Sequence, residues 1–91
     1  MENTAHIIVK RMCDALNHTW DIIGGDILES RKVMGESTEL TREEVMEIIT
    51  DADYLKTYGG DEQAYNAFMH LNEFEREEVL RLAFPFKTYS Y

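Results

Sequence analysis

Apolar residues recur at helical spacing along most of the chain, and their phase predicts where helices lie. At about 100° per residue, residues 4–23 place a broad apolar arc opposite a polar one. Thr4 or Asn3 can cap the start of this helix. The pair Gly24-Gly25 favours its end, because glycine adopts the left-handed turn without steric cost. The apolar arc comprises Ala5, Ile8, Val9, Met12, Ala15, Leu16, Thr19, Trp20 and Ile23.

A shorter helix is expected over residues 26–34. Asp26 and Glu29 have the spacing of a capping box, in which two side chains satisfy the first backbone amides, and Gly35 can stop the helix. The polar segment 36–39 that follows shows no periodicity, which indicates a loop.

The strongest local signal lies at residues 40–45 and predicts a helix over 41–58. The Thr41 hydroxyl can accept from the amide three residues on, Glu44 can reach back, and Leu40 can pack against Val45. Gly59-Gly60 then ends the helix. Its apolar face comprises Val45, Ile48, Ile49, Ala52 and Leu55.

Two further helices are expected, over 61–71 and 73–84. Asp61 is a natural cap for the first, and Asn72 with Glu75 offers a capping box for the second; a continuous, bent helix over 61–84 is the alternative. Pro85 ends the helical part. Residues 85–91 form an aromatic tail whose alternation suits a short strand, although the rest of the sequence offers it no partner strand.

Together these elements predict one all-α domain over residues 1–91, a small bundle of four to five short helices with an aromatic C-terminal tail. A hydrophobic content of 44%, periodically spaced, sets the chain apart from disordered acidic segments. The single cysteine, Cys13, cannot form an internal disulfide, and the start of the chain lacks the apolar run of a secretory signal. We therefore expect a cytoplasmic protein outside the membrane.

Charge is distributed unevenly along the chain. The net charge is −9, of which residues 1–35 contribute −1 and residues 36–91 contribute −8. This excess argues against direct binding to nucleic-acid phosphates or anionic lipid, because both would repel the protein. The partner favoured by charge is a protein with a basic surface, such as a nucleic-acid-handling protein.

Helical phasing turns part of the acidic half into a candidate docking surface. On the helix expected over 41–58, the side chains opposite the apolar face include carboxylates and tyrosines, which supply charge and rigid contact area. The tyrosines could instead fold under the C-terminal tail. The candidate partner-binding residues are Glu43, Glu44, Glu47, Asp51, Tyr54 and Tyr58.

Two Glu-x-x-Glu pairs are the features closest to catalytic chemistry. Glu44 with Glu47, and Glu75 with Glu78, could hold Mg²⁺ against a nucleotide if they faced each other. This spacing resembles that of the all-α nucleotide pyrophosphatases, whose pattern ends in Asp where this chain has Glu78. Glu44 and Glu47 lie away from the apolar face, however, and metal ligands must converge inside a bundle. We therefore expect no catalytic residue, metal or cofactor.

The expected function is that of a non-enzymatic regulator or inhibitor that docks on a basic protein surface. In size and charge the chain resembles small acidic helical phage proteins that disable host nucleic-acid enzymes, and nucleic-acid mimicry is a special case of such docking. One alternative is a homo-oligomeric scaffold, in which Ile7, the exposed tyrosines and the tail aromatics pack against other copies. Another is a metal-dependent nucleotide hydrolase or a helical bundle that holds a small molecule.

Overall fold

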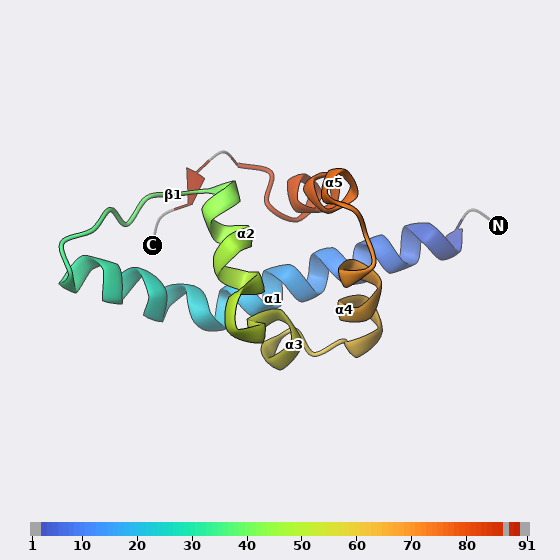
Figure 1. Ribbon diagram of the computed structural model, residues 1–91, viewed down its shortest axis with the longest axis horizontal. Coiled ribbons are helices and arrows are strands. Elements are labelled where there is room, and N and C mark those ends of the chain that lie inside the picture. Colours follow the sequence, from blue (N-terminus) through green and yellow to red (C-terminus); the bar gives the residue numbers. More distant parts are fainter. Residues whose placement is uncertain (1–2, 87, 90–91) are drawn as a thin grey trace.

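One long helix organises the structure. The computed structural model describes residues 3–86 and 88–89, and its first helix, α1 (Asn3–Val33), runs the length of the molecule (Figure 1). At about 1.5 Å per residue this helix is about 46 Å long, close to the longest dimension of 49 Å. The shorter helices all contact it: α2 (Arg42–Thr50), α3 (Tyr54–Tyr58), α4 (Glu62–Met69) and α5 (Glu73–Ala83).

The predicted all-α fold is confirmed, and its core lies between α1 and the shorter helices. Leu16, Ile49 and Phe68 are buried within one apolar cluster to which all of these helices contribute. Among the described side chains of the arc expected for residues 4–23, Met12, Ala15 and Leu16 belong to this cluster and Ile8, Val9 and Trp20 pack against it. Ile7, outside that arc, is 56% exposed. Among the aromatic residues of the C-terminal part, Phe84 is buried whereas Phe86 is 67% exposed.

The predicted helix end at Gly24-Gly25 is wrong, because α1 continues through both glycines to Val33. A Cβ atom on Gly24 would lie 2.9 Å from the Trp20 ring, so the glycine leaves room for that ring beside its own helix. Ile23 and Leu28, buried on either side, offset the cost of about 1 kcal/mol for glycine inside a helix. The predicted break before residues 26–34 therefore does not form.

Gly35 follows the end of a helix, as predicted, although that helix is α1 and not a separate one over 26–34. Its φ of 76° is left-handed, and the amides of Gly35 and Glu36 donate to the carbonyls of Lys32 and Arg31 at 3.1 and 2.8 Å. This pair of bonds is the Schellman pattern that satisfies the last carbonyls of a helix. The chain then returns along residues 36–39 toward α2 (Figure 1).

The start of α2 is confirmed, but the predicted single helix over 41–58 is wrong. The capping box forms, with the Glu44 amide donating to the Thr41 hydroxyl and the Thr41 amide donating to the Glu44 carboxylate. A 3₁₀ turn at Asp51–Asp53 then separates α2 from α3. In one straight helix Ile49 and Leu55 would point about 120° apart. The left-handed turn at Asp53, with φ of 58°, lets both side chains enter the core.

Residues 61–84 form two helices, which excludes the continuous bent helix. Asp61 caps α4 by accepting from the Ala64 amide, and Asn72 caps α5 through a capping box with Glu75. Both caps are those predicted from the sequence. Gly60, with φ of 74°, makes the turn between α3 and α4.

The C-terminal tail does have a partner strand, contrary to the expectation. β1 (Leu40–Thr41) pairs antiparallel with β2 (Thr88–Tyr89). The partner arises because Thr41, as the residue that caps α2, has an extended backbone. Arg42 holds the same tail by donating to the carbonyls of Phe84, Pro85 and Phe86 at 2.8–3.2 Å. The remaining tail residues, 87 and 90–91, lie outside the described part of the chain.

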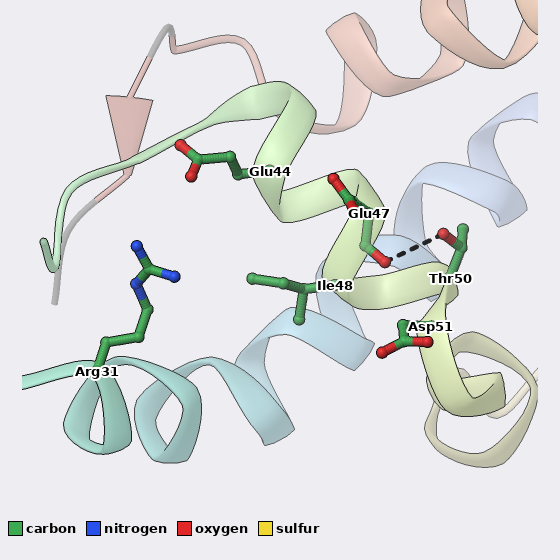
Figure 2. A pocket seen from close by; sticks show the side chains of 6 residues that line it. All are labelled: Arg31, Glu44, Glu47, Ile48, Thr50 and Asp51. Atoms are coloured by element: carbon green, nitrogen blue, oxygen red, sulfur yellow. Dashed lines mark hydrogen bonds between the residues drawn. The ribbon is translucent and has the colours of Figure 1, made fainter. Parts of the chain in front are cut away.

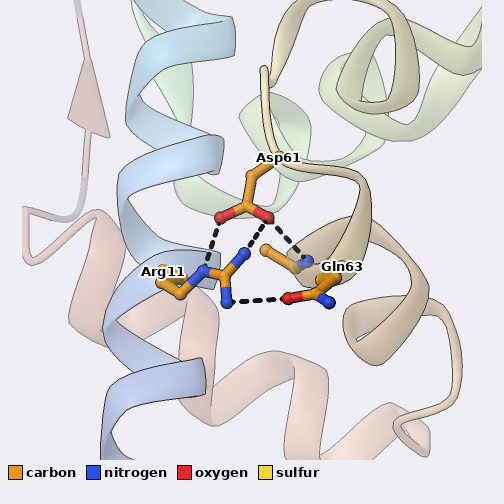
Figure 3. A network of polar contacts seen from close by, with 4 residues as sticks. Arg11, Asp61 and Gln63 are labelled. Atoms are coloured by element: carbon orange, nitrogen blue, oxygen red, sulfur yellow. Dashed lines mark hydrogen bonds and ion pairs between the residues drawn. The ribbon is translucent and has the colours of Figure 1, made fainter.

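Arg11 joins α1 to the beginning of α4. Its Nε and Nη2 atoms donate to the two carboxylate oxygens of Asp61 at 2.7 and 2.5 Å, and its Nη1 donates to Gln63 at 3.0 Å (Figure 3). These bonds raise the pKa of Arg11. The pKa of Asp61 is lowered, first by the hydrogen bonds from Arg11 and then by the Ala64 amide. Asp61 therefore serves at once as a helix cap and as one half of an interhelical ion pair.

Replacing Gly59 by alanine is expected to destabilise the protein. The added Cβ would lie 2.5 Å from the Leu55 carbonyl oxygen and 3.5 Å from the Ala15 side chain, so the backbone must shift. We expect a loss of about 1–3 kcal/mol, as for other overpacked sites, measured by urea unfolding. The exposed neighbour Thr57 provides the control, since Thr57→Ala should change stability by less than about 0.5 kcal/mol. Equal effects of the two changes would contradict the close approach at Gly59.

The Asp61 ion pair should make stability depend on pH on the acid side. An Asp whose pKa is lower in the folded protein than in the unfolded chain stabilises the fold. This stability is fully present above the pKa of Asp in the unfolded chain, about 3.9, and is lost as the pH falls through the pKa in the folded protein. Asn can still cap α4, so Asp61→Asn should lower the melting temperature at pH 7, and the deficit should shrink below about pH 4. Thermal unfolding of both proteins across this range tests it, with the exposed Asp21→Asn as control. A deficit that stays constant with pH would rule out the ion pair as its cause.

Candidate acidic docking surface

The hollow that holds most of the predicted carboxylates lies between α2 and the C-terminal half of α1. Its volume is about 610 Å³, and Figure 2 shows Arg31 rising from α1 toward α2, opposite Glu44 and Ile48. The half-buried Ile48 supplies its apolar wall. The lining residues are Arg31, Glu44, Glu47, Ile48, Thr50 and Asp51. Three of the six residues predicted to bind a partner are therefore brought together here.

The three carboxylates of the hollow differ in their surroundings. Glu44 is half-buried and engaged in the capping box, and its pKa is lowered, chiefly by the hydrogen bond from the Thr41 amide and further by the charge of Arg31. Glu47 and Asp51 are exposed, and the described part of the chain places no basic group within ion-pair distance of either. The hollow thus presents two carboxylates that are free to meet a cation from outside.

Arg31 moderates this charge without cancelling it. Its Nε donates to the Ser37 carbonyl at 2.7 Å, which anchors the loop that follows α1. The guanidinium faces the Glu44 side of the hollow (Figure 2). It therefore leaves the Asp51 side more negative than the Glu44 side.

Glu43 lies on the other flank of α2. It borders a second hollow, of about 610 Å³, between α2 and the beginning of α5. Around the helix it is about 100° from Glu44, with Glu47 between them in phase. The residues that line this second hollow are Glu43, Met46, Leu71, Glu73, Arg76, Glu77 and Leu80.

Tyr54 and Tyr58 do not continue the acidic face of α2, because the 3₁₀ turn places them on the separate helix α3. Their rings contact each other, with centroids 6.1 Å apart and planes inclined by 34°. Tyr58 is 39% exposed and Tyr54 is half-buried. The six residues thus lie on three successive elements, α2, the 3₁₀ turn and α3, so the single helical face expected for them does not form. That they bind a partner stays a prediction.

In the second Glu-x-x-Glu pair, Glu75 serves the fold. The Glu75 carboxylate accepts from the Asn72 amide at 3.0 Å in the capping box of α5, and Glu78 is exposed. Within the described residues, no group of three or more His, Cys, Asp or Glu side chains is placed to hold a metal ion.

Sequence reasoning missed how the arginines are used. Arg11 binds Asp61, whereas Arg31, Arg42 and Arg76 donate to backbone carbonyls. Arg76 also lies over the Phe68 ring, at 5.4 Å from its centroid. No local sequence pattern predicts these contacts. Arg11 and Arg42 bind residues far away in the sequence, and Arg31 and Arg76 bind carbonyls on the other side of a turn. These arginines therefore hold the fold together, and Arg31, Arg42 and Arg76 do so beside the acids of α2.

Comparisons of the chain with protein-family models, with curated proteins and with solved structures found no match. Within the described residues, none of the helices has both the length and the apolar character needed to cross a membrane.

The two adjacent carboxylates should respond differently to neutralisation. Glu44→Gln is expected to lower the melting temperature, because a charged acceptor for the Thr41 amide becomes a neutral one. Glu47→Gln should leave it unchanged, since this exposed side chain makes no such bond. The loss in melting temperature caused by Glu44→Gln should shrink below about pH 4.3, the pKa of Glu in an unfolded chain. The lowered pKa of Glu44 stabilises the fold above this pH, and that stability is lost as the carboxylate becomes protonated. Thermal unfolding at neutral and acid pH checks both; equal deficits at neutral pH would contradict the assignment.

Proposed function

We propose that the protein is a non-enzymatic regulator or inhibitor that docks its acidic α2 surface on a basic protein. The observation that carries the proposal is the hollow beside α2, in which Glu47 and Asp51 have no ion-pair partner among the described residues and Ile48 supplies an apolar wall. This combination suits a lysine or arginine side chain, whose aliphatic stem packs on apolar surface while its head meets carboxylates.

The balance of charge around α2 supports the proposal. An exposed acid normally loses part of its attraction for partners when a neighbouring base screens it. The carboxylates of Glu43, Glu44, Glu47 and Asp51 outnumber the guanidinium groups of Arg31, Arg42 and Arg76 around this helix. The field around α2 therefore stays negative, and such fields speed association with oppositely charged proteins.

Nucleic-acid mimicry is the narrower form of this proposal. Glu47 and Asp51 are four residues apart, which is about 6 Å along a helix and so of the same order as the distance between neighbouring phosphates. Because α2 ends at Thr50, directly before Asp51, this spacing extends over about one turn. A short basic patch on a cytoplasmic nucleic-acid-handling protein fits this length.

Partner capture should depend on salt and on these particular carboxylates. With the full chain as bait, raising salt from about 0.1 M to about 1 M shortens the Debye length from about 10 Å to about 3 Å and should release the partner. The variant Glu44→Gln/Glu47→Gln/Asp51→Asn should weaken capture about tenfold or more, equal to about 1.4 kcal/mol.

The matched control removes three exposed carboxylates elsewhere, with Asp21→Asn/Asp26→Asn/Glu78→Gln. Both variants carry the same net charge, so the control should change capture by less than about twofold. Equal losses in the two variants, or capture that is insensitive to salt, would show that the α2 hollow does not direct binding.

A further inference from the structure

The hollow on the other flank of α2 has a different character from the first. Its floor is apolar: Leu80 is buried at 3% exposure, and Met46 and Leu71 are half-buried against the core. It follows the junction between α2 and α5, which contact each other. Methionine adapts its shape to what packs against it, so Met46 suits the floor of a binding groove.

Carboxylates border this apolar floor. Glu43 comes from α2, and Glu73 and Glu77 come from successive turns of α5, and all three are exposed. Glu73 and Glu77 are separated by four residues, which is about 6 Å along the helix. An apolar strip between acids of two helices is therefore open to solvent.

Two nearby arginines offset part of the charge of this border, and its three carboxylates leave it net negative. Arg76 donates to the carbonyls of Phe68 and Met69, at 3.2 and 2.8 Å, which fixes its guanidinium at the C-terminal end of α4. Arg81 meets Glu77 at 3.3 Å, with both side chains about half exposed. Such an exposed pair contributes little stability and can be exchanged for a partner's cation.

We propose that this groove binds a basic amphipathic helix of the partner protein. Its apolar side chains would cover Met46 and Leu71, and its lysine or arginine side chains would meet Glu43, Glu73 and Glu77. This inference rests on the proposed function, because it assumes a basic partner. The inference specifies that the partner contributes a helix. It also gives α2 a second contact site, so that the partner would bind on both flanks of this helix.

A helix is favoured over an extended segment by the shape of the site. The groove lies between two helices, and an amphipathic helix presents apolar anchors at i, i+3, i+4 and i+7 to such a surface. Lysines four residues apart on that helix repeat at the same 6 Å or so as Glu73 and Glu77. An extended segment binds mainly through main-chain hydrogen bonds to the edge of a sheet. The lining of this groove consists of side chains from helices α2 and α5 and from Leu71 before α5, which suits a helix better.

A model peptide tests the proposal directly. The probe is a peptide of about 18 residues, or five turns, made of leucine and lysine with the leucines on one helical face. Its control is a scrambled peptide of the same composition. We expect the amphipathic peptide to bind about tenfold more tightly than the scrambled one in fluorescence anisotropy, and to gain helical circular dichroism on binding. Equal affinities, or binding without a gain in helix, would overturn the proposal.

Variants on the two flanks of α2 locate the binding. Glu43→Gln/Glu73→Gln/Glu77→Gln changes the groove border, and the hollow variant Glu44→Gln/Glu47→Gln/Asp51→Asn has the same net charge. The border variant should weaken peptide binding about tenfold, and the hollow variant less than about threefold. Met46→Lys should abolish binding, whereas Met34→Lys, at a residue 70% exposed beyond α1, should not.

The outcomes separate this inference from the proposed function. If the hollow variant loses peptide binding and the border variant does not, the groove is not the helix site, although docking of a basic partner on α2 survives. If both variants bind the peptide as the unmodified protein does, then neither the groove nor the acidic surface of α2 recognises basic segments. The border residues are exposed, so the border variant decides the question even if Met46→Lys fails to fold.

Discussion

Burial of one face of α1 is the constraint on which the rest of the structure depends. The four shorter helices all contact this helix, and α4 and α5 also bond to it through polar groups. Arg11 binds the cap of α4, and the Asn17 side chain donates to the Ala83 carbonyl at the end of α5. A chain of this size buries a limited core, so such bonds between segments contribute to fixing where each short helix lies. The position of α2, and with it of the acidic surface, follows from this arrangement.

The same bonds shape the charge of the surface. Arginine donates several bonds in a fixed fork, which suits it to hold carbonyls and carboxylates of distant segments together. Arg11, Arg42 and Arg76 are used in this way, and Arg42 and Arg76 keep their charge beside the acids of α2. The arginines that stabilise the bundle therefore also offset part of the acidic charge around α2, which stays net negative.

Local signals in the sequence were sufficient where local chemistry decides the structure. The capping boxes at Thr41 and Asn72 and the cap at Asp61 form as predicted, because each involves residues within one turn. The end predicted at Gly24-Gly25 failed because burial of Ile23 and Leu28 outweighs the cost of glycine. The pairing of β1 with β2 was missed because it joins residues far apart in sequence. In the candidate site, phasing correctly turned Glu47 and Asp51 outward, but it could not foresee the left-handed turn at Asp53 that separates the tyrosines from them.

The central claim is that the surface around α2, rather than net charge alone, directs docking. Amide chemical shifts of the isotope-labelled protein, followed by NMR while a short arginine-rich peptide is added, test this claim most directly. The account predicts that shifts change along residues 43–51 and at Arg31, across the hollow, while exposed acids elsewhere such as Asp21, Glu62 and Glu78 stay unaffected. Shifts of equal size at all exposed acids would contradict it, because they would show that the peptide follows charge without regard to the shape of the surface.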